Sequence, residues 1–240
     1  MFGIVALIAI VAEMIIGGMD SAAIAGGIKD IASTIVIVIM NFRDVEKKLC
    51  IIVDEQTAKL LSPDVEANAL LCMGYVDHMA GLTYEALALA NYCDGDYSVV
   101  WEAKEICLKI RAGSVANKII MPIENKVLLN KFQSRIEILE NYYTDADVLE
   151  CRAIEELDKF RHPEFPDDLA MFLAKKGNKM ETIWVRALSF IGTNEHMIAI
   201  KVQLLNEPYS DFGVHIHNEI DAFSFIDDNG ERVFAHVVRE

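Results

Sequence analysis

Two histidines and two carboxylates alternate in one short string near the end of the sequence, at His215, His217, Glu219 and Asp221. If this string were extended, the alternation would point all four side chains to one face. Three such groups can hold a zinc or iron ion. The string therefore defines a candidate metal site at His215, His217 and Glu219, which an enzyme of unrecognised type could use. The interpretation that we favour is a turn of solvated polar residues.

Other reactive residue types lack the spacing that chemistry requires. Gly17-Gly18-Met19-Asp20 has neither the dinucleotide nor the P-loop spacing, so a plain tight turn is expected there. Glu155-Glu156 and Asp167-Asp168 are neighbours along the chain, and adjacent helical residues do not face each other, so we expect solvated carboxylates. His78 lies in an apolar stretch and is expected to be a hydrogen-bonded core histidine. No catalytic residue is identified, and no cofactor is expected.

The five cysteines indicate a reducing compartment. Their number is odd and no CxxC pair occurs among Cys50, Cys72, Cys93, Cys107 and Cys151. Unpaired spacing of this kind is typical of reduced, mostly buried thiols in a cytosol. We therefore predict a cytoplasmic protein.

Charge restricts the class of partner. The 240 residues carry 22 Lys and Arg against 37 Asp and Glu, a formal net charge of −15. A nucleic acid backbone would be repelled over most of such a surface, so nucleic acid binding is not expected. A protein partner, which could itself be basic, fits this charge better.

The beginning of the chain is strongly apolar. Phe2 to Ala12 contains no polar side chain, and Glu13 is the first charge. A membrane span needs about 20 apolar residues, and a secretory signal needs basic residues at its start. We expect a buried strand rather than a membrane element. The alternative is an exposed apolar strand that pairs with another subunit, as in a homo-oligomer or a structural assembly.

Periodicity predicts an α+β domain over residues 1–115. Strands are expected at 2–12 and 34–40 around an Ala-rich helix at 21–32, followed by a short strand at 48–53. Ser62-Pro63-Asp64 is a strong helix start, and apolar residues recur at helical spacing as far as Val76. A strand at 84–92 would complete the βαββαβ order of a ferredoxin-like unit, and a helix is expected at 101–111.

A helical connector and a small β-barrel are expected beyond that domain. Residues 125–142 and 145–160 are amphipathic and free of Gly and Pro, which predicts a connector over 116–162. His162-Pro163-Glu164-Phe165-Pro166 breaks the helical pattern and marks the boundary. From 163 to 240, short β-prone segments at 182–191, 197–205, 221–226 and 233–238 predict an antiparallel barrel. Trp184 is expected in its core, since few other aromatic residues could fill it.

The C-terminal third resembles a known family. Its Ile183-Trp184-Val185-Arg186 strand, Leu204-Leu205-Asn206-Glu207-Pro208-Tyr209 turn and Phe212-Gly213-Val214-His215 segment are similar to the YegJ-like bacterial domains of unknown function and to related predicted immunity domains. Where that family would have a Gly-Asp pair, this chain has His217-Asn218-Glu219. The resemblance implies a turn at this point and a binding or protective module rather than an enzyme.

The sequence therefore favours a non-enzymatic bacterial binding protein, immunity-like in role, that engages a protein partner through an acidic surface. The alternatives are a metal-dependent enzyme that uses His215 and His217 and a structural assembly subunit.

Overall fold

The computed structural model describes residues 41–103, 108–141, 145–194 and 196–238 as an α+β fold with two separate sheets. The strands and helix predicted at residues 2–40 lie outside the described residues. The described chain opens with a short helix, α3 (Phe42–Val45), which is capped by the side chain of Asn41. The described residues all belong to one compact unit.

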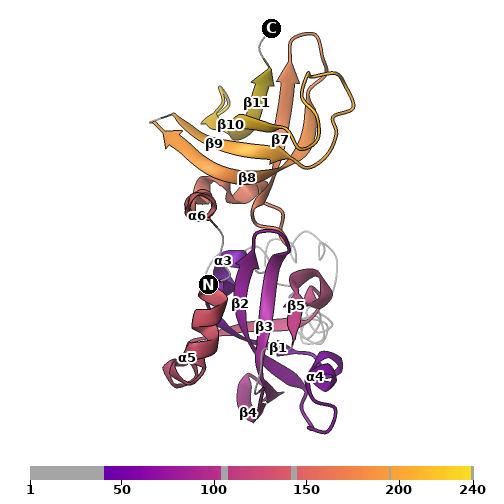
Figure 1. Cartoon of the computed structure of the whole chain (residues 1–240), viewed down its shortest axis with the longest axis vertical. Coiled ribbons are helices and arrows are strands. Elements are labelled where there is room, and N and C mark those ends of the chain that lie inside the picture. The colour runs from indigo at the N-terminus through magenta and orange to yellow at the C-terminus, as the bar shows by residue number, and fades with distance from the viewer. Residues whose placement is uncertain (1–40, 104–107, 142–144, 195, 239–240) are drawn as a thin grey trace, which may run out of the picture. The chain divides into compact units, whose positions relative to one another are not determined.

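The first sheet is antiparallel and has the strand order β4-β3-β2-β1-β6, with β5 paired to β3 (Figure 1). Its strands are β1 (Leu49–Val53), β2 (Ala69–Asp77), β3 (Gly81–Cys93), β4 (Asp96–Glu102), β5 (Lys109–Arg111) and β6 (Ile119–Ile123). Helix α4 (Glu55–Leu61) lies between β1 and β2, and a 3-10 turn (Ala112–Val115) follows β5.

Two helices predicted from the sequence are strands. The run from Ala69 to Val76 lies in β2 and is buried throughout, and residues 101–111 contain the end of β4 and all of β5. Both faces of β2 are covered by hydrophobic clusters, so the strand is apolar without alternation. An apolar run of this kind cannot be told from a buried helix by periodicity alone. The predicted helix from Ser62 is therefore wrong. The other elements of the ferredoxin-like order, at 2–40, remain a prediction.

The connector predicted over 116–162 is helical only in part, because β6 (Ile119–Ile123) lies within it and pairs with β1 of the first sheet. Helix α5 (Lys126–Asn141) packs Phe132, Ile136 and Leu139 against one face of the first sheet. The second predicted helix is shorter than expected: α6 (Ala146–Ala153) is followed by a 3-10 segment, Glu155–Phe160.

The second sheet confirms the predicted small barrel: it is closed and has five strands, one more than the four predicted segments, in the order β10-β11-β7-β8-β9. Its strands are β7 (Asp168–Lys175), β8 (Glu181–Thr193), β9 (Met197–Leu204), β10 (Glu219–Ile226) and β11 (Arg232–Val238). Four of the five pairings are antiparallel, and β11 closes the barrel against β7 in parallel.

The barrel core corrects the expectation for Trp184. Ile183 and Val185 point inward and are at most 2% exposed, so strict alternation along β8 places Trp184 on the outer surface, where 40% of it is exposed. The barrel is filled by aliphatic side chains together with Phe212 and Phe234.

Candidate functional site

The structure gives the three residues of the predicted metal string separate surroundings. His215 Nδ1 pairs with Glu207 Oε1 at 2.7 Å, His217 occupies a left-handed turn with φ of 70°, and Glu219 begins β10. Within the part of the chain that the structure describes, no three His, Cys, Asp or Glu side chains lie close enough to share an ion. The hydrogen bond between Glu207 and His215 lowers the pKa of Glu207 and raises the pKa of His215. The pair thus fastens a turn.

That turn belongs to a long connection between β9 and β10, residues 205–218, which we call the tyrosine loop (Figure 1). Glu207 Oε2 accepts the amide proton of Ile216 at 2.8 Å. Glu181, at the start of β8, accepts the amide protons of Tyr209 and Ser210 at 2.8 and 2.9 Å. Charge-assisted bonds to backbone amides are the stronger kind, so two carboxylates fix the shape of the loop.

Phe212 anchors the tyrosine loop in the barrel. Its side chain is completely buried within the barrel core, whereas Tyr209, three residues earlier, is completely exposed. The loop therefore has a rigid attachment and a free aromatic side chain.

Trp184 adjoins the same loop. Its amide donates to Asn206 Oδ1 at 2.8 Å, and its carbonyl accepts from the amide of Leu205 at 2.9 Å. The ring of His162 packs edge-on against the indole with centroids 5.2 Å apart. The Trp strand and the Leu-Asn-Glu-Pro-Tyr turn, which carry the family resemblance, are thus brought together.

We call this region the Trp184–Tyr209 face, and define it by Met180, Trp184 and the tyrosine loop. Glu181 and Trp184 lie three positions apart on β8, about 10 Å along the strand, and alternation directs their side chains to opposite sides of the sheet. Met180 is 55% exposed beside them. Charges of both signs contact the loop: Lys175 donates to the carbonyl of Asp211 at 3.1 Å, and the carboxylates of Glu181 and Glu207 accept loop amide protons.

A buried ionic cluster joins the barrel to the first sheet. Arg152, on α6, is 3% exposed and donates two hydrogen bonds to Asp167 at 2.9 and 2.7 Å and one to Glu46 at 2.9 Å. His78, at the end of β2, contacts the same Asp167 at 2.9 Å. The prediction of a hydrogen-bonded core histidine is confirmed in part: His78 is hydrogen-bonded, but its side chain is 22% exposed and it follows a strand.

A second arginine pair extends this cluster. Arg43, on α3, donates two hydrogen bonds to Asp158 at 2.6 and 2.8 Å and a third to the carbonyl of Arg152 at 2.8 Å. Arg161 also donates to Asp158, at 3.0 Å, and its guanidinium reaches the carbonyls of Cys151 and Pro166. Each charged group in the cluster has a partner. The cluster joins the two sheets because Arg43 precedes the first sheet and its partner Asp158 precedes the barrel.

The prediction that Asp167 and Asp168 are solvated is wrong. Both are buried, and Asp168 forms a two-pronged pair with Arg186 at 2.7 and 3.0 Å. They lie at the entry to β7, where side chains alternate between directions, so each finds a different arginine. A pair of prolines just before them, at the predicted boundary, was the available signal that the chain changes direction here.

Acid should weaken this buried ionic cluster between the two sheets. Burial alone would raise the pKa of Asp167, but hydrogen bonds and positive charge from Arg152 and His78 lower it overall; Arg43 and Arg161 do the same for Asp158. A carboxyl pKa depressed by folding stabilises the protein above its unfolded value near 3.9, and that stability is lost as the pH falls through the folded value. We expect the free energy of unfolding, measured in urea, to fall steeply below about pH 4.

The control for this pH dependence is Asp167→Asn, which removes one of the two depressed groups. Its stability should change less between pH 5 and pH 3 than that of the unaltered protein. A profile equally steep in both proteins would exclude Asp167 as a source.

Other titratable groups are enclosed. Both oxygens of Glu85 lack a hydrogen-bond partner among the described residues, and burial raises its pKa despite the nearby charges of Lys109 and Arg135. Burial likewise raises the pKa of Cys50 and of Cys151 to about 12. Since the side chains of Glu85, Cys50 and Cys151 are inaccessible to solvent, they offer no reactive surface.

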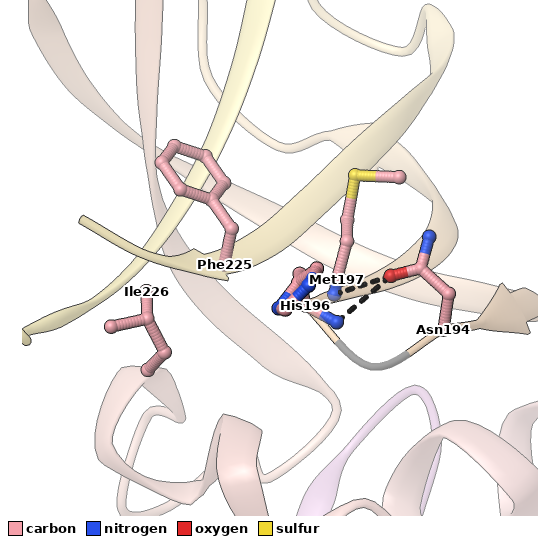
Figure 2. A pocket seen from close by; sticks show the side chains of 5 residues that line it. All are labelled: Asn194, His196, Met197, Phe225 and Ile226. Carbon is pink, nitrogen blue, oxygen red and sulfur yellow. Dashed lines mark hydrogen bonds between the residues drawn. The ribbon is translucent and has the colours of Figure 1, made fainter. Parts of the chain in front are cut away.

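One open depression lies at the β8–β9 turn (Figure 2). It is lined by Asn194, His196, Met197, Phe225 and Ile226. The Asn194 side chain accepts the amide protons of His196 and Met197, both at 2.9 Å, and so serves to shape the turn. The depression brings together no set of groups that could perform chemistry.

Comparison with known proteins adds no relative: no protein-family model, curated protein or solved structure matches this chain. The YegJ-like and immunity resemblance therefore remains a prediction. Among the described helices, none combines the length and apolarity needed to cross a membrane.

Proposed function

We propose that this chain is a non-enzymatic binding protein and that the Trp184–Tyr209 face contacts its protein partner. The observation that carries the proposal is a fully exposed tyrosine on a loop fixed by Glu181, Glu207 and the buried Phe212. Tyr and Trp are the residues most enriched among those that dominate binding energy. A loop that is already ordered loses little conformational entropy on binding.

The face differs in one respect from the acidic surface expected from composition. The net charge of −15 would attract a basic protein at long range, but a lysine, Lys175, contacts the loop of Tyr209 as well as the carboxylate of Glu181. We propose that contact at this face depends on its aromatic side chains and that the overall charge acts on approach. A protective, immunity-like role is one form that such binding would take, and a toxin gene beside this one would support it.

The proposal is tested by affinity capture of the full chain from its native host, with bound proteins quantified for three forms. Tyr209→Ala should deplete the specifically bound protein at least tenfold, as expected for loss of a dominant interface residue. Val127→Ala, at a side chain 75% exposed on α5, is the matched control and should change nothing. If both variants captured equal amounts of the bound protein, the Trp184–Tyr209 face would not be the binding site.

Trp184→Ala should leave the protein folded. Because Trp184 is 40% exposed and lies outside the barrel core, we expect a loss of about 1 kcal/mol in the free energy of unfolding. Leu204→Ala, at a fully buried position of the same barrel, should cost about 2–5 kcal/mol. Urea denaturation of both variants measures the difference, and a Trp184→Ala loss as large as that of Leu204→Ala would place Trp184 in the core after all.

A further inference from the structure

We infer that the outer surface of the barrel over β9, β10 and β11 is a second interface, which binds a basic amphipathic helix of a partner protein. The inference goes beyond the proposed function, because it uses none of the residues that define the Trp184–Tyr209 face. It is carried by the strand register, which collects apolar side chains on the outside of the barrel, and by the carboxylates beside them.

The register places six apolar side chains on one outer surface. Side chains alternate along a strand, and Ala222 and Ser224 of β10 are completely buried, so Phe223 and Phe225 point outward. Residues directly opposite each other on neighbouring strands share a face of the sheet. The residues opposite Phe223 are Ala199 and Ala235, and those opposite Phe225 are Met197 and Val233. We call these six residues the phenylalanine face.

The phenylalanine face is separate from the core of the barrel. None of its six residues belongs to the hydrophobic cluster that fills the barrel within the described part of the chain. Phe223, Phe225, Met197 and Val233 are all partly exposed. The apolar row also continues onto β7, where Phe172 is paired with Ala235. The face is therefore an apolar surface on the outside of the barrel.

The same strands carry polar side chains on their outer surface further along. The next outward pairs between β9 and β10 are Lys201 with Asp221 and Gln203 with Glu219. Lys201 and Asp221 form an exposed ion pair at 3.4 Å. A solvated sheet surface would continue this polar pattern, whereas a contiguous apolar patch with a polar rim marks a contact with another molecule.

The charges beside the phenylalanine face are mostly negative. One residue pair beyond Phe225 and Val233, the strands enter the β10–β11 turn, in which Asp228 and Glu231 are exposed. Strands β9, β10 and β11 and this turn contain two basic residues, Lys201 and Arg232, against five carboxylates: Glu219, Asp221, Asp227, Asp228 and Glu231. These carboxylates attract lysines and arginines that flank an apolar stripe. They repel anionic lipid headgroups and nucleic acid.

The shape of the barrel favours a helix as the partner. Its five strands close on themselves, which leaves no free strand edge in the barrel to which a partner could add a strand. A partner must therefore lay its side chains on the outer surface. Neighbouring strands are about 4.8 Å apart, so the apolar row from β9 to β7 spans about 14 Å, enough for a helix about 10 Å wide.

The open depression at the β8–β9 turn lies at one end of the phenylalanine face. Met197 and Phe225 line it, together with the polar residues Asn194 and His196. Figure 2 shows Met197 and Phe225 pointing to one side of the sheet and Ile226 to the other, as the alternation along β10 requires. The depression would accept one side chain of the docked helix.

The test is a fluorescence anisotropy titration of the full chain with a labelled helical peptide of about 18 residues, in which leucines form one stripe and lysines fill the other positions. One control peptide has the same composition in an order without a stripe, and the other keeps the leucine stripe but replaces lysine with glutamate. We expect the leucine-lysine helix to bind at least tenfold more tightly than either control, and its affinity to fall as salt is added.

Variants of the protein locate the binding site. Phe225→Ser and Met197→Gln, each confirmed as folded by its urea midpoint, should both weaken peptide binding, Phe225→Ser by at least tenfold. Val127→Ser, at an exposed apolar residue of α5, is the matched control and should change nothing. None of these substitutions alters the Trp184–Tyr209 face, so the two proposals can fail separately.

A charge variant tests the part played by the carboxylates. Asp228→Asn combined with Glu231→Gln should weaken binding about threefold at low ionic strength. Asp64→Asn combined with Glu66→Gln removes the same charge from exposed positions before β2 and should leave the affinity unchanged.

Three results would overturn the inference. The first is equal binding of all three peptides, and the second is binding that Phe225→Ser and Met197→Gln leave intact. The third is a dimer of the unaltered chain in sedimentation equilibrium that Phe225→Ser dissociates, because the phenylalanine face would then bind a second copy.

Discussion

Replacing Arg152 with methionine should destabilise the protein by about 3–5 kcal/mol, one of the two largest effects that we expect. The side chain is 3% exposed and is the shared partner of Asp167 and Glu46, which come from opposite sides of the joint. Methionine fills much of the space but donates no hydrogen bond, so Asp167 would be left buried with only His78 as a partner. The free energy of unfolding from urea titration at pH 7 measures the loss.

The control is Lys59→Met, which removes an exposed pair between Lys59 and Glu55 within α4. Surface pairs of this kind contribute at most about 1 kcal/mol, so the midpoint of unfolding should scarcely move. If Arg152→Met were as mild as Lys59→Met, the buried cluster would not hold the two sheets together.

Phe212→Ala should cost a similar amount, about 3–5 kcal/mol, because a completely buried aromatic ring would be deleted from the barrel core. It should also loosen the tyrosine loop, because only the hydrogen bonds to Glu181 and Glu207 would then hold its backbone. Two readouts therefore change together: stability to urea falls, and hydrogen exchange of the amides of Tyr209 and Ser210 becomes faster.

The matched variant is Tyr209→Ala, three residues away in the same loop and fully exposed. It should keep both the stability and the slow exchange of the loop amides, since a surface substitution usually changes stability by no more than about 0.5 kcal/mol. The pair of variants thereby distinguishes loss of binding caused by a disordered loop from loss of a contacting side chain. Slow exchange in Phe212→Ala would contradict the role of Phe212 as the anchor of the loop.

The barrel could be predicted from the sequence because most of its strands have local sequence signals. Turn residues such as Asp227-Asp228-Asn229-Gly230 separate short β-prone segments, and the closed barrel of the structure contains all four of them. The parallel pairing of β7 with β11 joins residues more than 60 positions apart. No local sequence pattern predicts a contact between residues so distant in the chain.

The first sheet was predicted less well for a physical reason. Its strand β2 is buried on both faces, so its apolar residues fit helical spacing as well as extended spacing. The 13-residue strand β3 also begins before the segment that was predicted as a strand, at Gly81.

The candidate site shows the same division between local and distant information. That the Trp strand and the Leu-Asn-Glu-Pro-Tyr turn matter could be inferred from resemblance, but their contact depends on the pairing of β8 with β9. Trp184 was assigned to the core by its size, whereas the alternation with Ile183 and Val185 decides its direction. His215 was considered as a metal ligand, although its partner Glu207 lies eight residues earlier, in a turn that the sequence did not place beside it.

The most direct test of the central claim, that the Trp184–Tyr209 face binds protein, is photo-crosslinking in the native host. A benzophenone amino acid is placed at position 209 of the full chain and, in a matched form, at position 127, which is also exposed. The account predicts one discrete adduct from position 209 and none from position 127, and the mass of the adduct tells a second copy of this chain from another protein. Adducts from position 127 but not from position 209 would contradict the account.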